Sequence, residues 1–562
     1  MLCLLVYTIY ASQCLSGTIL NIPSGTTSIA DSQYQKCTTI STLTMPDSVT
    51  SIGSSAFDSC TSLKVVTLSR NLISMGKNAF HKTAIQEIVI PDGVSVLKEN
   101  LFYECKNLKK VTFPKNIKSV MNSCFAMTVI EEFVFPDGLQ FIDMGISWGN
   151  LKLRRVIIPD SCTTISYSAF GGCSGLQEVT LPKGIKMLNG SVFAQTGLVN
   201  FIIPDSVEII GETCFWQTKI QTISIPPKVI RIDRSAFYQC IYLKSIVFEG
   251  NSLKIIGPTV FEKCTSLTNL TFPSSLVNIS VDACKECQNL KTVIVQCDLS
   301  AFLYIGYSSS FYKCDKLDTL VYESNIPIPR INNFPLHLIR TLIINNSNLE
   351  SIGDITVGRK LSTIAFVDPS TKFTFSSKLY NDITLNISIS SSINGFSENV
   401  FENVSIDTFI YCGKSISDNS FLKNSKGFKK VITSSSFRGE TIGGVKINEK
   451  TDQCTQLIPF EVKYQEESGS EEPEKTNEPE KSSPATASSN NNNQDNSGSS
   501  NEENNSSKDG KGKGKGGKIA GGIIGAILIL AAIAVIAFFI YKYKIHKSEN
   551  DSEEQPVELS LV

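Results

Sequence analysis

A unit of 22 to 24 residues repeats through most of this 562-residue chain, and such a repeat constrains the fold more than length or composition does. In a typical copy a proline follows three apolar residues spaced i, i+3 and i+5, as Pro182 follows Leu176, Val179 and Leu181. The marker position, held by this proline or its substitute, recurs at Pro23, Pro46, Ser69, Pro91, Pro114, Pro136, Pro159, Pro182, Pro204, Pro226, Glu249, Pro273 and Gln296.

Each unit predicts one short strand and one tight turn. Val66 and Leu68 flank the polar Thr67, an alternation typical of a strand with one buried face. Proline has no N–H and ends the strand, and the Pro-Asp-Ser or Pro-Asp-Gly that often follows favours a turn. Two more apolar residues follow the turn. A phenylalanine then stands eleven residues after the marker, in the series Phe57, Phe80, Phe102, Phe125, Phe170, Phe193, Phe215 and Phe237.

A unit with one short strand cannot bury its own apolar face, so the units must stack with their strands paired in parallel. The predicted fold class is therefore a solenoid. Residues 46–60, PDSVTSIGSSAFDSC, resemble the BspA-like leucine-rich repeats. The resemblance implies a parallel β ladder on a concave side and an irregular or short-helical convex side. It also implies a surface antigen that displays its ectodomain for adhesion to host or matrix proteins and to other cells.

The strand pattern continues beyond residue 322, although the proline, the Ala-Phe pair and the cysteine are lost. Ile339, Leu342 and Ile344 keep the i, i+3, i+5 spacing, and similar triplets follow at intervals of 22 or 23 residues. We therefore expect residues 17–464 to form one ectodomain of about nineteen rungs, degenerate on the convex side after residue 322. Residues 434–464 are expected to cap the last rung.

Three segments outside the repeat predict a membrane-anchored protein. Residues 1–14 are apolar and too short to span a bilayer, which favours a signal peptide, although a buried first strand is the alternative. Residues 465–518 lack large apolar side chains and are expected to form a disordered stalk. Residues 519–541 contain no charge over 23 positions and predict a transmembrane helix. Residues 542–562 would then be the cytoplasmic tail of a single-pass type I protein of the plasma membrane.

Two short motifs in the membrane-anchoring region predict partners. Gly517, Gly521 and Gly525 make small-xxx-small spacings that permit close pairing of two membrane helices, although glycine is also common in such helices. The chain ends Ser560-Leu561-Val562, which looks like a C-terminal ligand of PDZ domains.

The composition and motifs argue against catalysis and nucleic-acid binding. The net charge is −1, so there is no basic excess to attract nucleic acid. The chain has three histidines, His81, His337 and His546, and no catalytic motif of known spacing. We expect no enzymatic activity and no cofactor.

The seventeen cysteines follow the repeat rather than a metal-site pattern. Cys287 lies fourteen residues after its marker, and Cys284 takes the phenylalanine position, so register explains this CxxC pair. We expect the cysteines at the fourteenth position to be small buried residues whose thiols donate to loop carbonyls, and no zinc site. These are Cys37, Cys60, Cys105, Cys173, Cys240 and Cys287. Whether any cysteines form disulfides is left open by the sequence.

Candidate N-glycosylation sites have the Asn-x-Ser/Thr pattern and fit a secreted domain. Within the repeats they are Asn189, Asn269, Asn278, Asn345, Asn386 and Asn403. Asn269 and Asn386 fall four residues before their marker positions, and glycans there would confine a protein ligand to the rungs between about Leu63 and Ile246.

The outward strand residues offer a candidate binding face. The position two before the marker is β-branched in nearly every copy through Ile294 and Val321, and the position four before it alternates in charge from Glu87 through Lys110 to Glu178. This pattern can serve strand stability and cross-strand charge pairing alone, or it can form a binding face. The candidate concave binding face comprises Val89, Thr112, Val134, Ile157, Thr180, Ile202, Ser224 and Val247.

The expected function is protein–protein interaction at the cell surface, with an extracellular host, matrix or cell-surface protein as the partner. The alternatives are a receptor that signals through its short tail and a structural component of a surface coat. Changing Ser48, Gly93 and Ser206 in the turns should control for mutations of the face, because these positions are expected to be exposed.

Overall fold

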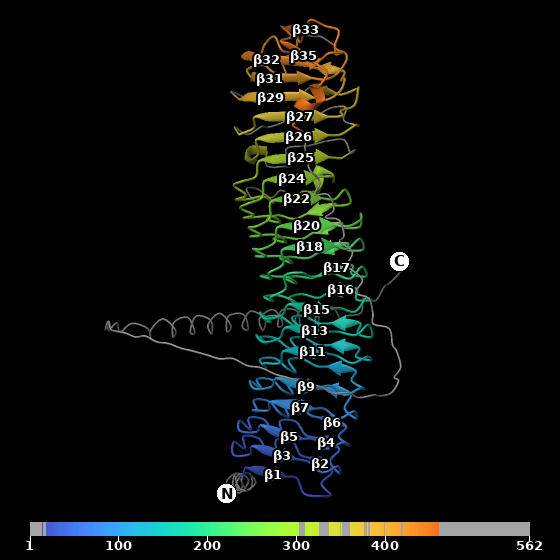
Figure 1. The fold of residues 1–562 in the computed structure, drawn as a ribbon, viewed down its shortest axis with the longest axis vertical. Coiled ribbons are helices and arrows are strands. Elements are labelled where there is room, and N and C mark those ends of the chain that lie inside the picture. Colours follow the sequence, from blue (N-terminus) through green and yellow to red (C-terminus); the bar gives the residue numbers. More distant parts are fainter. Residues whose placement is uncertain are drawn as a thin grey trace, which may run out of the picture. The chain divides into compact units, whose positions relative to one another are not determined.

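The computed structural model describes residues 14, 18–302, 310–324, 336–348, 350, 360–375, 379, 383–397, 400–417 and 420–459. These residues belong to one compact unit of the chain, in which successive repeats stack as the rungs of a parallel β-solenoid (Figure 1). The predicted fold class is confirmed. Among these residues no helix has both the length and the apolar character needed to cross a bilayer.

The predicted strand of each repeat forms the first ladder. Neighbouring strands pair in parallel and in register, so that Leu43 lies beside Val66 and Phe133 beside Val156. Where the strand of one repeat is missing, a single bridge between Asn200 and Thr222 replaces it. The strands are β1 (Ile19–Asn21), β3 (Thr42–Thr44), β5 (Val65–Thr67), β7 (Glu87–Val89), β9 (Lys110–Thr112), β11 (Glu132–Val134), β13 (Arg155–Ile157), β15 (Glu178–Thr180), β18 (Thr222–Ile225), β20 (Ser245–Phe248), β22 (Asn269–Phe272) and β24 (Thr292–Val295).

The first ladder continues through the region where the sequence repeat degenerates. One nine-stranded sheet runs from β22 to β35, and its strands lengthen toward the C-terminus. The expected triplet at 339–344 is present, with Leu342 beside Leu320 and Ile364 in register. The added strands are β25 (Thr319–Glu323), β26 (Thr341–Asn345), β27 (Thr363–Val367), β29 (Thr384–Ile389), β31 (Ser405–Tyr411) and β32 (Gly427–Ser434).

A second ladder, which the sequence analysis did not predict, follows the turn of each repeat. Its strands are only two residues long, and each directs one apolar side chain inward, as Ile52 is 2% exposed and Leu97 fully buried. They are β2 (Ser28–Ile29), β4 (Ser51–Ile52), β6 (Ser74–Met75), β8 (Val96–Leu97), β10 (Ser119–Val120), β12 (Phe141–Ile142), β14 (Thr164–Ile165), β16 (Met187–Leu188), β17 (Ile209–Ile210), β19 (Arg231–Ile232), β21 (Ile255–Ile256) and β23 (Asn278–Ile279), with β28 (Thr374–Phe375) and β30 (Gly395–Phe396) as a later pair.

The third side of each rung is a stack of turns rather than the short helix that the family resemblance allowed. Two residues four apart have positive φ in nearly every copy, such as Ser55 at 54° and Ser59 at 61°. Alternate amides therefore bond within the turn and to the next rung: Phe57 N donates to Ala79 O at 2.8 Å, while Asp58 N donates to Ser55 O. The helices in the described residues are three short 3₁₀ segments, η1 (Leu299–Ala301), η3 (Leu336–Leu338) and η4 (Cys454–Leu457).

The phenylalanine series forms a continuous stack inside the solenoid. Ring centroids of neighbours lie 5.2 to 6.2 Å apart with nearly parallel planes, for example Phe57–Phe80 and Phe215–Phe237. This is the offset stacking that aromatic rings prefer. Ser147 interrupts the stack between Phe125 and Phe170, and its buried hydroxyl has no hydrogen-bond partner. Cys284 takes the expected place after Phe261, since Phe261 N donates to the carbonyl of Ala283.

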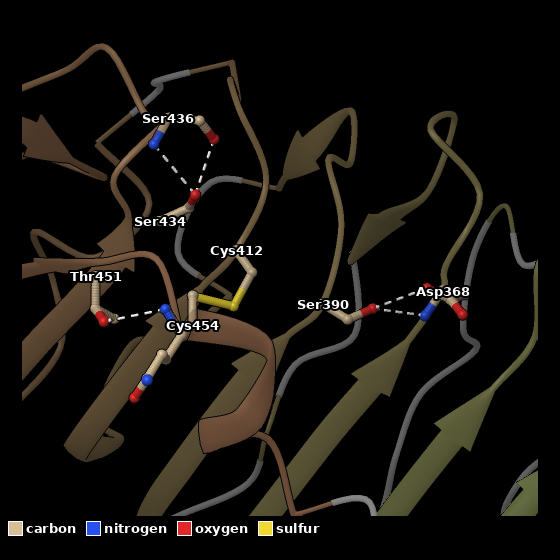
Figure 2. The surroundings of a disulfide bond; sticks show 8 residues. Asp368, Ser390, Cys412, Ser434, Ser436, Thr451 and Cys454 are labelled. Carbon is tan, nitrogen blue, oxygen red and sulfur yellow. Dashed lines mark hydrogen bonds between the residues drawn. A yellow bond between two sulfur atoms is a disulfide. The ribbon is translucent and has the colours of Figure 1, made fainter.

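The C-terminal rung is covered by a hairpin and a final strand. β33 (Thr441–Ile442) and β34 (Val445–Lys446) pair antiparallel, and β35 (Glu449–Thr451) pairs in parallel with β32. The chain then forms η4, which a Cys412–Cys454 disulfide ties to the end of β31 (Figure 2). The described part of the segment expected to cap the solenoid, 434–459, thus contacts its last rung.

The N-terminal rung carries a second disulfide, between Cys14 and Cys37. The predicted signal peptide otherwise lies outside the described residues. A cleavage that preserves this disulfide must fall before Cys14, one residue earlier than the boundary expected from the sequence. The predicted stalk, the membrane helix with Gly517, Gly521 and Gly525, and the tail with Ser560 and Val562 also lie outside the described residues.

Replacing Phe215 with alanine should lower the free energy of unfolding by about 3 to 5 kcal/mol, because it removes a fully buried ring from the middle of the stack. Changing Tyr242, whose side chain is exposed, to alanine is the control and should alter it by no more than about 0.5 kcal/mol. Denaturant unfolding followed by circular dichroism measures both. Equal effects of the two substitutions would contradict a core that depends on the stack.

Candidate binding face

The outward side chains of the first ladder form two columns that run along the solenoid. The apolar column contains the residues two before each marker, and the polar column contains those four before it. The two columns together are called the sheet face below. Because neighbouring strands are in register, each column is continuous from rung to rung, as Val134, Ile157 and Thr180 show.

The N-terminal part of the apolar column is open to solvent. Val89 is 66% exposed, Val134 51%, Ile202 88% and Val247 53%, and these are large fractions for aliphatic side chains. Thr112, Thr180 and Ser224 are also exposed, whereas Ile157 is only partly so. The Ser224 hydroxyl donates to the Glu249 carboxylate. The structure therefore places all eight candidate residues of the sequence analysis in one column.

The polar column contains a three-residue charge cluster. Arg155 donates to Glu132 at 2.6 Å and to Glu178 at 3.1 Å, one neighbour on each side. These hydrogen bonds, that to Glu132 first, raise the pKa of the Arg155 guanidinium. Glu87 and Lys110 are also register partners. The alternating charges thus pair across rungs as expected, although exposed ion pairs contribute little stability.

The C-terminal part of the apolar column is buried, which corrects the expectation that it stays outward and exposed. Ile294 is 7% exposed and Val321 1%, although both point away from the main core. They form a separate apolar cluster with Ile343, Ala365, Val367 and Ile458. Only the last of these comes from outside the ladder. The sequence pattern could not reveal this burial, because the covering residue lies more than ninety positions away from Val367.

The candidate glycosylation sites differ in how accessible their side chains are. Asn269 and Asn403 are exposed, and Asn269 lies in the polar column as expected. Asn386 is also in register but only partly exposed, as is Asn278. Asn189 donates its amide to the carbonyl of Ile165, and Asn345 donates to Glu323. Since glycosylation modifies the same amide nitrogen, the first two are the better acceptors, and glycosylation itself stays a prediction.

The cysteines at the fourteenth repeat position are buried and donate to backbone carbonyls, as the sequence analysis predicted. Cys60 contacts Tyr34 O at 3.0 Å, Cys173 contacts Ser147 O at 3.1 Å, and Cys287 contacts Phe261 O at 3.1 Å. Cys37 is the exception because it forms the disulfide with Cys14. Burial raises the pKa of the Cys173 thiol to about 12 and that of Cys105 to about 11. At neutral pH these thiols are protonated and poor nucleophiles or metal ligands.

No group of three or more histidine, cysteine or acidic side chains arranged to hold a metal ion occurs within the described part of the chain. His81 accepts or shares a hydrogen bond with Asp58 at 2.8 Å, in an inter-rung contact on the turn side. Its role is therefore explained by stacking, and it lies away from the sheet face.

The repeat matches a known family over more than half of the chain. The BspA-type leucine-rich repeat region matches in six copies, over residues 27–150, 146–254, 187–318 and 231–357. The chain belongs to the BspA-type leucine-rich repeat family. A bspA-like surface protein of Trichomonas vaginalis is 27% identical over 163 residues, which are 29% of this chain and 24% of that protein.

Solved structures of leucine-rich repeat proteins are similar to this chain at low identity. A protein from Bacteroides ovatus is 22% identical, with 57% of this chain and 90% of that chain covered and a TM-score of 0.42. A leucine-rich cell surface protein from Faecalibacterium prausnitzii is 21% identical, with 54% and 87% covered and a TM-score of 0.33. The pneumococcal vaccine antigen PcpA is 16% identical, with 68% and 89% covered and a TM-score of 0.30.

Replacing Cys173 with serine should lower the free energy of unfolding by about 1 to 3 kcal/mol, because a more polar group is then fully buried at a site shaped for sulfur. Cys173→Ala is the matched control, since it loses the hydrogen bond without burying a hydroxyl. Thermal unfolding with metal analysis of the purified protein measures the outcome. Stoichiometric zinc that is lost in the serine variant would contradict the structural role of this thiol.

Proposed function

We propose that this protein binds extracellular proteins through the N-terminal part of its sheet face and thereby mediates adhesion to host or matrix proteins or to other cells. The observation that carries the proposal is the exposure of the apolar column from Val89 to Val247 beside a column of charges. Contiguous exposed apolar surface with a polar rim is characteristic of interaction sites.

The dimensions of this surface favour a protein partner over a small molecule. Val89 and Val247 are separated by seven rung steps, which corresponds to about 34 Å. Small-molecule sites are concave and enclose most of their ligand, whereas an extended sheet offers many separate contacts. A partner that contacts several rungs at once gains from each of them, as in other solenoids.

Three features support a location at the cell surface. The sequence predicts a signal peptide at 1–14 and a membrane helix at 519–541, which would make this a type I protein. The Cys412–Cys454 disulfide fits an oxidising extracellular environment. A relative is described as a bspA-like surface protein.

The same features support a role in binding rather than catalysis. The buried thiols are protonated at neutral pH, since burial raises the pKa of Cys60 and Cys297 to about 12. The exposed charges of the sheet face are paired with each other around Arg155. Such a surface recognises shape and charge, and it has no activated nucleophile among the residues considered above.

Changing Val89, Val134 and Ile202 together to aspartate should abolish attachment to cells or matrix proteins. All three side chains are at least half exposed, so the fold should tolerate the change while the apolar contact surface becomes charged. Attachment of cells that display the full chain measures the effect, and surface staining with circular dichroism of the purified protein checks the fold.

The control variant must place the same charges elsewhere on the solenoid. The turn residues Ser48, Gly93 and Ser206 are unsuitable, which corrects the expectation that they are exposed. The Ser48 hydroxyl is buried, a Cβ at Gly93 would lie 2.5 Å from Leu72 O, and Ser206 donates to the Ile185 carbonyl.

Ile73, Ile230 and Val277 are better controls, because they are exposed β-branched residues beside the second ladder. Changing these three to aspartate should leave attachment intact. Equal loss in both variants, or loss in neither with the fold preserved, would exclude the sheet face as the adhesive surface. Deleting residues 542–562 should likewise leave attachment intact, whereas a receptor would lose its signal.

A further inference from the structure

Four neighbouring side chains on the sheet face are buried although they point away from the main core. Ile294, Val321, Ile343 and Ala365 are register partners on β24 to β27, so they form one continuous apolar strip. They are at most 7% exposed, compared with 53% for Val247 in the same column. Outward side chains of a sheet are buried only where another part of a molecule lies on them.

The described chain ends beside this strip. Ile458 belongs to the same apolar cluster and follows η4 directly. η4 is held at the end of β31 by the Cys412–Cys454 disulfide, and Cys412 itself packs against the cluster (Figure 2). The disulfide therefore delivers the C-terminal segment to the sheet face at its β27 to β31 end.

One isoleucine is too small to cover the strip. The four residues span three rung steps, or about 14 Å, which is several times the width of a side chain. The sequence after Ile458 supplies what is missing. Phe460, Val462 and Tyr464 alternate with Glu461 and Lys463, the pattern of an extended segment with one apolar side. From residue 458 to 464 such a segment reaches about 20 Å.

We propose that residues 458–464 cross the sheet face from β27 to β24 as a strap, with the side chains of Phe460, Val462 and Tyr464 on the apolar strip. The lengths agree at both ends. The alternation stops at Gln465, where the chain becomes uniformly polar, and burial of the column stops at β24, since Thr271 on β22 is again partly exposed. Because the strap is part of the same chain and begins at the disulfide, it competes favourably with any separate molecule for this strip.

The strap divides the sheet face into two parts with different occupants. The rungs from β24 to β27 bind the chain's own C-terminal segment, and the rungs up to β20 stay open for an external partner. This inference does not depend on the adhesive function, because it concerns the closed part of the face only.

Thiol labelling of the full chain tests the strap. Val321→Cys should react with a maleimide at least about tenfold more slowly than Val247→Cys, since its site opens only when the strap detaches. The native buried thiols should contribute little background because burial raises their pKa, as at Cys173. Changing Phe460, Val462 and Tyr464 together to aspartate should bring the rate at position 321 close to that at 247. The matched control, Glu461→Gln with Lys463→Gln, should leave position 321 protected.

Disulfide trapping provides a second test with conservative substitutions. Val462→Cys should crosslink with Cys introduced at Val321 or Ile294, whereas Lys463→Cys, on the opposite side of the strap, should not. Crosslinks are detected as fragments that stay joined after proteolysis until reduction. Protection of position 321 that survives the triple aspartate change would assign the strip to a second copy or another partner and overturn the proposal. Absence of crosslinks at position 462, or equal crosslinking at 463, would overturn it even where the triple variant unfolds.

Discussion

The structure depends on hydrogen bonding between rungs on all three sides of the solenoid. A strand of three residues, such as Val65–Thr67, has no stability alone, and a two-residue strand such as Ser51–Ile52 has less. Each becomes stable because the rungs above and below supply its hydrogen-bond partners. The turn side follows the same rule, since residues such as Ser55 adopt positive φ and thereby direct amides to the next rung. The inward side chains, with the phenylalanine stack at their centre, are then buried against neighbouring rungs rather than against their own.

The periodicity of the sequence made the stacked direction predictable. Strand positions, the phenylalanine stack and the placement of Cys284 all follow from counting residues from the marker, and they hold even where the marker itself is lost, as at Leu342. The second ladder was missed because two residues are too few to show an alternation. The turns with positive φ were missed because serine, lysine and glutamine occupy them as often as glycine does.

Features that depend on contacts across many rungs could not be predicted. The pairing of Cys412 with Cys454 joins positions 42 residues apart, in a part of the chain where the repeat has no cysteine register. The burial of Ile294 and Val321 has the same origin, because their covering residues come from beyond Cys454. A period-based argument treats every outward position alike. The candidate site was therefore located correctly in the N-terminal rungs, where nothing overlies the column, and its C-terminal limit came only from the structure.

The two columns of the sheet face contribute differently to recognition. The charges around Arg155 pair with their neighbours, so they add little affinity for a partner but restrict which partners fit. The exposed aliphatic side chains at Val89, Val134 and Ile202 carry the apolar area that association can remove from water. They also suit β-strands, which explains why strand stability and binding cannot be separated by composition alone.

The central claim is that one ladder continues from β1 to β32 despite the change in sequence after residue 322. Hydrogen–deuterium exchange of the full chain tests it most directly, because amides that bond across rungs exchange only when the ladder opens. The account predicts that the amides of β25 to β31 are protected to a similar degree as those of β5 to β20. Exchange of β25 to β31 at the rate of an unfolded chain, with β5 to β20 still protected, would contradict it.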